Sequence, residues 1–220
     1  MSKLPNGLFG NISGKLNNVI ISSWKGIPYV KSKPTQIRDP KTPLQAAQRS
    51  RFSRIMSIMV PLSQVVRIGF KGYADKMSAF NAAVSYNLKQ AFSADTSNPE
   101  IQYPNLLFSR GNHIGIEEGL CEAIPEGSVR LLWKDKPSLG GSYANDRIMA
   151  VLVNETSCSS AYYPDAGSRV QGSIILALPQ YQPGDVVHSY IAMINPAKAL
   201  SGNAKQGISD SRYVGCIAAL

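Results

Sequence analysis

Side chains that perform chemistry at neutral pH are scarce in this sequence. It holds two histidines, His113 and His188, and three cysteines among 220 residues. Because histidine is the residue whose ordinary pKa lies nearest neutrality, few general bases are available. The Gly-x-Ser-x-Gly pattern, the phosphate-loop pattern and the dinucleotide-binding glycine pattern are also absent. We therefore expect no catalytic residues, no cofactor and no enzymatic activity.

Metal and disulfide frameworks are missing as well. The cysteines are odd in number and widely spaced, at Cys121, Cys158 and Cys216. This spacing fits neither a zinc site nor paired disulfides, so we expect buried free thiols in a reducing compartment. His113 has Glu117 and Glu118 close by, but a metal would need further ligands that the neighbouring sequence does not offer.

Long apolar runs are lacking too. No stretch of about 18 apolar residues occurs, which predicts no transmembrane helix and no membrane insertion. The first seven residues, Met1 to Gly7, have no apolar signal core. We expect synthesis in the cytoplasm without a cleaved signal peptide.

Acidic residues are rare in the first part of the chain. Residues 1–92 contain 14 Lys and Arg against two acids, Asp39 and Asp75, whereas residues 93–220 contain 9 against 12. Such asymmetry indicates either a polyanionic partner for the first part or an electrostatic fit between subunits. A solvated basic face without a partner is the third interpretation.

A β-hairpin is the first element that the pattern predicts. The runs 19–24 and 27–32 are rich in β-branched and aromatic residues and flank Lys25-Gly26. Pro28 has no N–H to donate, which predicts a free edge on the second strand. The preceding segment, residues 6–18, is rich in Gly and Asn, and needs something to lie against because it has few apolar groups.

Helical spacing follows the hairpin. Thr42-Pro43 is a strong helix start, and the apolar pattern continues to Met59 before Pro61 interrupts it. A short helical piece over 62–68 and a second long helix over about 74–92 come next. We expect the two long helices to form an antiparallel pair.

From residue 128 the period changes to two. Candidate strands, separated by Gly, Pro, Asn and Asp, are 129–134, 147–153, 160–163, 171–178, 186–194 and 212–218, with a further one at 106–110. Trp133 and Tyr190 resemble the core aromatics of fibronectin type III and immunoglobulin-like modules. The predicted fold class is α+β, with a basic hairpin-and-helices assembly domain (1–92), a linker (93–127) and an Ig-like antiparallel β-sandwich (128–220).

Part of the sequence resembles an uncharacterised domain family known mainly from Bacteroidota and their mobile elements. The resemblance covers roughly residues 6–112. It rests on Asn11 to Lys15, Trp24-Lys25-Gly26, Val30 to Pro34, Thr42-Pro43 with Gln45, Gln48, Arg49 and Phe52, Asn81-Ala82-Ala83, Tyr86-Asn87-Leu88 and Ser109 to Asn112. The family implies no activity or site. Similar hairpin and Gln/Arg-helix openings occur among phage structural proteins, by analogy.

One set of residues carries the strongest chemical signal. These basic and aromatic residues are Lys15, Trp24, Lys25, Tyr29, Lys31, Lys33, Arg38, Lys41, Arg49, Arg51 and Arg54. They suit an assembly contact or a polyanion contact. We predict a self-associating structural protein that forms homo-oligomers, as a component of a phage or phage-derived particle. The alternatives are a nucleic-acid-binding protein, with non-specific contacts, and a displayed Ig-like binding module.

Overall fold

The computed structural model divides the chain into two compact units, Met1–Thr42 and Pro43–Leu220. It describes residues 2–3, 13–24, 27–36, 42–75, 77–93, 100–134, 143–178, 180–200 and 204–220. Each unit is treated by itself below. We call the first the front sheet and the second the sandwich unit.

The front sheet is antiparallel and contains the predicted hairpin. Its strands are β1 (Ser2–Lys3), β2 (Gly14–Leu16), β3 (Val19–Trp24) and β4 (Ile27–Ser32), in the order β1-β4-β3-β2. Asn17 has a φ of 49°, the left-handed conformation that a tight two-residue hairpin turn requires and that Asn tolerates. Part of the Gly- and Asn-rich segment thus lies against β3, as we expected of a segment with few apolar groups. β1 pairs with Val30 and Tyr29 of β4, next to Pro28, so the prediction of a free edge on the second hairpin strand was wrong for these residues.

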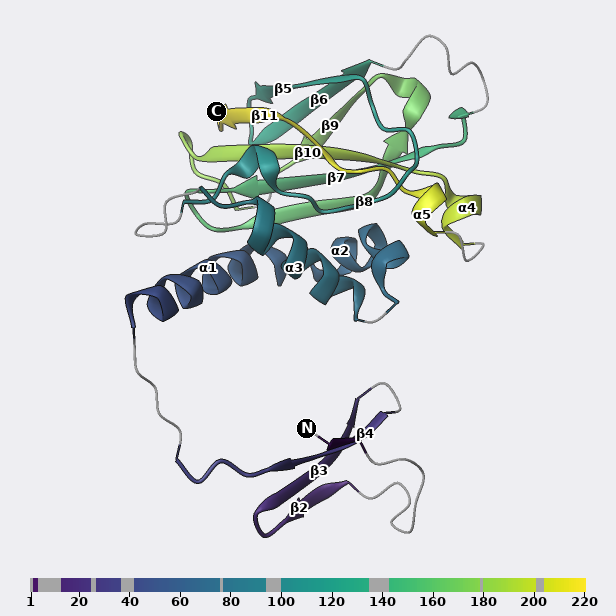
Figure 1. Cartoon of the computed structure of the whole chain (residues 1–220). Coiled ribbons are helices and arrows are strands. Elements are labelled where there is room, and N and C mark those ends of the chain that lie inside the picture. Colours follow the sequence, from purple (N-terminus) through teal and green to yellow (C-terminus); the bar gives the residue numbers. More distant parts are fainter. Residues whose placement is uncertain are drawn as a thin grey trace. The chain divides into compact units, whose positions relative to one another are not determined.

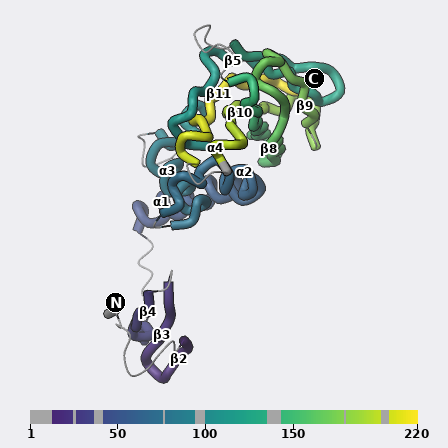
Figure 2. Tube along the Cα trace, turned by 90° about the vertical axis from the view of Figure 1, so that its right-hand side faces the viewer, coloured from purple at the N-terminus to yellow at the C-terminus, as the bar shows by residue number. Residues whose placement is uncertain are grey.

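The sandwich unit has three layers, as Figure 1 shows. Helices α1 (Pro43–Met59), α2 (Ser63–Gly69) and α3 (Ala79–Gln90) cover one face of a four-stranded sheet, and a three-stranded sheet covers the other. Figure 2 shows the same layering from the side. The four-stranded sheet has the order β11-β10-β7-β8, and the three-stranded sheet the order β5-β6-β9.

The remaining bounds complete the unit. The strands are β5 (Glu118–Ile124), β6 (Ser128–Lys134), β7 (Arg147–Asn154), β8 (Ser160–Ser168), β9 (Ser173–Ala177), β10 (Val186–Ile194) and β11 (Arg212–Ala218). The short helices are η1 (Lys71–Tyr73), η2 (Tyr103–Asn105), η4 (Arg169–Gln171), α4 (Pro196–Leu200) and α5 (Ala204–Gly207). An α+β fold with an antiparallel sandwich is therefore confirmed.

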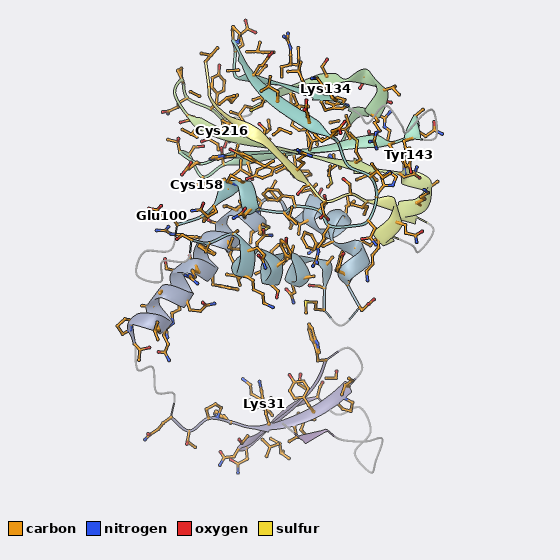
Figure 3. All side chains as sticks on the ribbon, turned by 45° about the horizontal axis from the view of Figure 1, so that its top comes forward. Lys31, Glu100, Lys134, Tyr143, Cys158 and Cys216 are labelled. Carbon is orange, nitrogen blue, oxygen red and sulfur yellow. The ribbon has the colours of Figure 1, made fainter. Side chains whose placement is uncertain are left out.

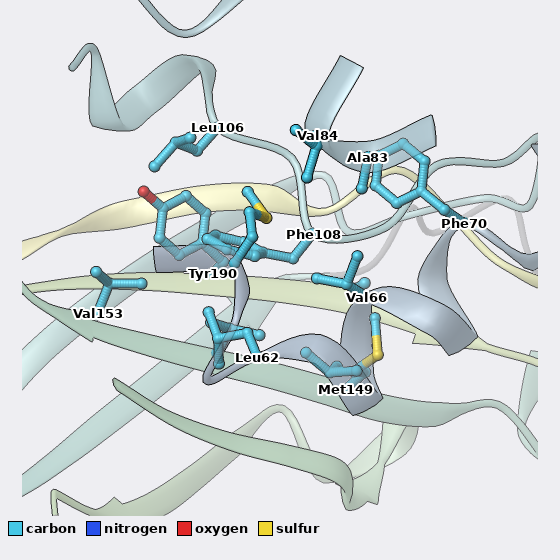
Figure 4. Close-up of a cluster of buried hydrophobic side chains, with 14 of the residues drawn as sticks. Leu62, Val66, Phe70, Ala83, Val84, Leu106, Phe108, Met149, Val153 and Tyr190 are labelled. Carbon is cyan, nitrogen blue, oxygen red and sulfur yellow. The ribbon is translucent and has the colours of Figure 1, made fainter. Parts of the chain in front are cut away.

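Strand β7 shows how the layers are joined. Met149, Val151 and Val153 face the helices, while Ile148, Ala150 and Leu152 face the three-stranded sheet. Strand β10 is likewise buried on both sides. Side chains alternate between the two faces of a strand, so a continuous apolar run suits a strand covered on both sides. Figure 4 shows the helix-side core, in which Tyr190 lies among Leu62, Leu106 and Phe108.

The division of the chain differs from the one that the sequence predicted. We placed the helices with the hairpin in residues 1–92, but they share a core with β7 and β10. The segment 93–127, which we took for a linker, contains the fully buried Leu106 and Phe108 and strand β5. The physical reason is that the helices bury their apolar side against a sheet from later in the sequence. The predicted strand at 106–110 is instead an irregular segment, bound through Arg110 N–H to the Gly69 carbonyl.

Candidate functional site

The predicted site residues fall into both units. Lys15, Trp24, Tyr29, Lys31 and Lys33 belong to the front sheet or follow it directly. The arginines Arg49, Arg51 and Arg54 lie on α1, in the sandwich unit. The other three, Lys25, Arg38 and Lys41, lie outside the described residues. The five front-sheet residues are therefore described together below, and the arginines of α1 with the sandwich unit.

Strand register assigns the front-sheet residues to faces. Directly opposed residues of antiparallel strands point to the same side of a sheet. Ile20 lies opposite both Lys15 and Lys31, Ser22 lies opposite Tyr29, and Trp24 lies opposite Ile27. One side therefore gathers Lys15, Ile20, Ser22, Trp24, Ile27, Tyr29 and Lys31. We call this the basic-aromatic face, and Figure 3 marks Lys31 on it.

The other side of the sheet is apolar. Its rows are Leu16 with Val19, Ile21 with Val30, and Ser23 with Pro28. The described side chains of this apolar face, namely Leu16, Val19, Ile21, Ser23, Pro28, Val30 and Ser32, include no charged group. The continuous run Val19-Ile20-Ile21 hides this division in the sequence, since it is apolar at every position. The pairing of β3 with β2 and with β4 reveals it.

Neither face is buried within the described part of the front sheet. The side chains of residues 13–24 and 27–36 are all exposed or half-buried. Leu16 is 71% exposed and Trp24 57% exposed. A two-sided sheet without a covered face gains little from the hydrophobic effect, and the described residues of the front sheet do not themselves cover its apolar face.

The first turns of helix α1, in the sandwich unit, also expose apolar side chains. From Pro43 to Arg54 no residue is buried, and the first buried one is Ile55. Leu44 is 73% exposed and Phe52 is also exposed. Of the arginines on this helix, Arg51 lies over the Phe92 ring at 5.5 Å, and Arg54 lines a cavity. Those two cations are therefore engaged with their own unit.

That cavity lies beside the only buried histidine of the four-stranded sheet among the residues described. It has a volume of about 460 Å³, and Arg54, Glu100, Tyr103, Glu155 and Cys158 are among its lining residues. Burial, and secondarily the Glu155 carboxylate, raise the pKa of Tyr103 to about 12. This phenol therefore stays neutral over the physiological range.

His188 is held on every side. Its Nε2 lies 2.9 Å from Glu155 Oε2, and its Nδ1 lies 3.1 Å from the Tyr213 hydroxyl. Its ring stacks on Tyr103 with 3.8 Å between centroids. Burial raises the pKa of Tyr213. Because both ring nitrogens have partners, His188 fastens β10 to β11 and to the turn after β7, as a packed histidine does.

The second histidine belongs to a buried charged cluster. His113 Nε2 lies 2.6 Å from Asp146 Oδ2, and Arg169 Nη1 donates to the same oxygen at 3.1 Å. Asn195 donates to the other oxygen, Asp146 Oδ1, at 2.9 Å. Arg169 also donates to the carbonyl of Ile114. A buried carboxylate with this many donors ties four segments together, and His113 is directed to Asp146 instead of to Glu117 and Glu118.

Within the described ranges, no group of three or more His, Cys, Asp and Glu residues could hold a metal ion. The three cysteines are free, but Cys158 and Cys216 are exposed, so the expectation of buried thiols was wrong for two of them. Cys121 is half-buried, and burial raises the pKa of its thiol. No helix in the described part of the chain is long and apolar enough to cross a membrane.

A family profile matches most of the chain. Residues 11–213 match the profile of a family described as "Family of unknown function (DUF6266)". The match covers the front sheet from β2 onward, the helices and nearly all of the sandwich. No curated protein matches the chain.

Proposed function

The chain belongs to this family of unknown function, DUF6266, and since that membership supplies no activity, we propose on physical grounds that it is a non-enzymatic, self-associating structural subunit. One observation carries the proposal. No described residue before Ile55 is buried. This holds for the front sheet and for the start of the sandwich unit, although many of these residues are β-branched or aromatic. Sequences of this kind fold stably when their apolar groups are removed from water.

Two surfaces need a partner. The first is the apolar face of the front sheet, where Leu16, Val19, Ile21 and Val30 lie side by side by register. The second is the first three turns of α1, from Leu44 to Phe52. A helix segment of this length is marginal in water unless something packs on it. Both surfaces come from neighbouring parts of one chain.

The occupant that we propose is a second copy of the same chain. Residues 1–92 carry a net positive charge and residues 93–220 a net negative charge. A head-to-tail contact sets the front sheet of one copy, where residues 1–42 hold seven Lys and Arg and one acid, against residues 93–220 of the next, where 12 acids outnumber 9 Lys and Arg. Contacts between unlike surfaces build rings or filaments. We therefore expect assemblies larger than a dimer.

The test is the mass of the full-length protein in solution, measured by multi-angle light scattering after size exclusion and by negative-stain imaging. We expect discrete oligomers at micromolar concentration. Leu16→Ser and Leu44→Ser should each shift the population toward the monomer, because they remove apolar surface from the contact. Both side chains are largely exposed within one copy, so neither substitution should unfold it.

The matched controls are Leu120→Ser and Val170→Ser. These exposed apolar residues lie on the sandwich, at 57% and 70% exposure, and their loss should leave the oligomer unchanged. A 23.8 kDa monomer at all concentrations, with the front sheet resistant to protease, would contradict the proposal. The front sheet would then be covered from within its own chain.

Two finer proposals follow from the same reading. We propose that the sandwich is of the fibronectin type III kind. Counted from β5, its seven strands have the orders 1-2-5 and 7-6-3-4, which supports an immunoglobulin-related sandwich whose fourth strand has changed sheets. We also propose a phage-derived particle of Bacteroidota mobile elements as the assembly. Imaging the purified oligomer beside an intact particle tests that origin.

A further inference from the structure

The basic-aromatic face of the front sheet has the layout of a stacking platform. Lys15 and Lys31 flank Ile20 on the two neighbouring strands, about 9–10 Å apart at ordinary strand spacing. Trp24 and Tyr29 are diagonal neighbours on the same side, about 7–8 Å apart at their Cα atoms. The two cations thus share one row of the face, Tyr29 lies in the next row and Trp24 in the row after it.

Charge around this face is almost entirely of one sign. The first 42 residues contain seven Lys and Arg and a single acid, Asp39. In the described part of the front sheet, no carboxylate side chain is available to neutralise Lys15 or Lys31. Their positive potential is therefore available to an anionic ligand. Trp24, at 57% exposure, contributes little to any core of the described sheet, so its ring is also available to a ligand.

We propose that this face binds single-stranded nucleic acid without sequence preference. Phosphates contact Lys15 and Lys31, while bases stack on Trp24 and Tyr29. A duplex fits poorly, because its bases are already stacked on one another and cannot reach aromatic rings on a flat sheet. The carboxylates of an acidic peptide would pair with Lys15 and Lys31. They would leave the rings of Trp24 and Tyr29 without a stacking partner.

The proposal does not depend on self-association. The apolar face that we assigned to a second copy is the opposite side of the same sheet, so both contacts fit at once. Substitutions on one face should leave the other contact intact. Failure of nucleic-acid binding and failure of assembly are therefore separate results.

Intrinsic fluorescence makes a direct test possible. The chain has two tryptophans: Trp24 is exposed, and Trp133 is buried with its indole N–H donating to the Arg169 carbonyl at 2.9 Å. Titration of the full-length protein with unlabelled dT20 should quench the Trp24 emission through stacking. Anisotropy of fluorescein-labelled dT20 gives the affinity in parallel, against a 20-base-pair duplex, poly-glutamate and heparin.

The variants separate stacking from charge. Trp24→Ala should weaken dT20 binding by roughly five- to a hundredfold, whereas Trp24→Phe should keep most of the affinity and lose the quenching. Lys15→Ala with Lys31→Ala should reduce the slope of log K against log salt by about 1.4, since each single-strand phosphate contact contributes about 0.7. The control pair, Lys89→Ala with Lys134→Ala, removes the same charge from the sandwich unit and should change neither quantity. Leu16→Ser, on the apolar face, is the second control.

Three results would contradict the proposal. If heparin, poly-glutamate and duplex bind as tightly as dT20, the face is a general polyanion surface and the proposal fails. It also fails if dT20 does not bind, or if Trp24→Ala weakens binding no more than the control pair does. Far-ultraviolet circular dichroism of each variant shows whether the sheet has been kept. If Trp24→Ala has lost it, Trp24→Phe decides: normal affinity without quenching supports the proposal.

Discussion

Asn87 joins a helix to an irregular segment through its side chain. It is fully buried on α3, its Nδ2 donates to the carbonyls of Ala83 and Leu107, and its Oδ1 accepts from the Leu107 N–H. Alanine would leave both backbone groups of Leu107, which are partly buried, without these partners. We expect Asn87→Ala to lower the free energy of unfolding by roughly 2–4 kcal/mol in urea denaturation. Asn81→Ala, exposed on the same helix, should change it little.

The free energy of unfolding depends on pH through the carboxyl group of Asp185. The Asn154 side chain donates to Asp185 Oδ2 at 2.7 Å and the Gln182 N–H at 2.9 Å, and these bonds hold the pKa of the carboxyl below its usual 3.8. A lowered pKa means that the folded state prefers the carboxylate. Its contribution is present above pH 3.8 and is lost as the pH falls through the folded-state value.

Melting temperatures between pH 2.5 and pH 6 measure this effect. The gap between the parent protein and Asp185→Asn should be wide at pH 6 and should narrow toward pH 2.5. A gap that stays constant over this range would show that the charge of Asp185 is irrelevant to stability.

Helix α1 should be ordered unevenly along its length. Its last turns are held by Ile55 and Met59 in the helix-side core, whereas its first three turns have no buried residue. In a dilute monomer, amide exchange measured by mass spectrometry should be fast from Pro43 to about Arg54 and slow near Met59. Assembly should slow exchange in the first three turns. Equal protection along the whole helix in the monomer would contradict this expectation.

Several elements could be located from the sequence. The predicted ranges 186–194 and 212–218 are the bounds of β10 and β11, because apolar runs between clusters of Gly, Pro, Asn and Asp define strands well. Strand β5 was missed because its inward positions, Gly119, Cys121 and Ala123, are small and weakly apolar. The second long helix begins at Ala79 instead of 74, since the Ser78 hydroxyl accepts from the Asn81 N–H and caps it there.

The candidate site could be predicted only in part. Lys15, Trp24, Tyr29 and Lys31 were chosen by residue type, and the register places all four on one face. Arg49, Arg51 and Arg54 were grouped with them by closeness in sequence, but they belong to another unit. Closeness along a chain does not fix the face on which a side chain lies; strand pairing does. Ile20, Ser22 and Ile27, which complete the face, have no chemical signal of their own.

The boundary between the two units could not be predicted from the sequence, for a similar reason. Periodicity tells which side of a helix is buried, but not which element covers it. The helices α1 to α3 are covered by β7 and β10, strands that follow them by some 60 to 150 residues. The spacing of apolar residues within 43–92 does not identify β7 and β10 as the strands that cover these helices.

Truncation checks this division directly. Residues 43–220 contain both cores, so this fragment should unfold cooperatively at a melting temperature close to that of the full chain. Residues 128–220 alone should not, because the helix-side faces of β7 and β10 would be exposed to water. Calorimetry of the two fragments measures both outcomes. A cooperative transition in the 128–220 fragment would restore the boundary that we first drew near residue 128.

The contacts of residues 209–218 bear on biosynthesis. Gly111 N–H donates to Asp210 Oδ1, Ser109 Oγ donates to the Ser209 carbonyl, and β11 closes the edge of β10. None of these contacts can form until residues 209–218 have emerged from the ribosome. The helices are thus translated long before β7 and β10 can cover them, and a nascent polypeptide exposes their apolar side until those strands have emerged.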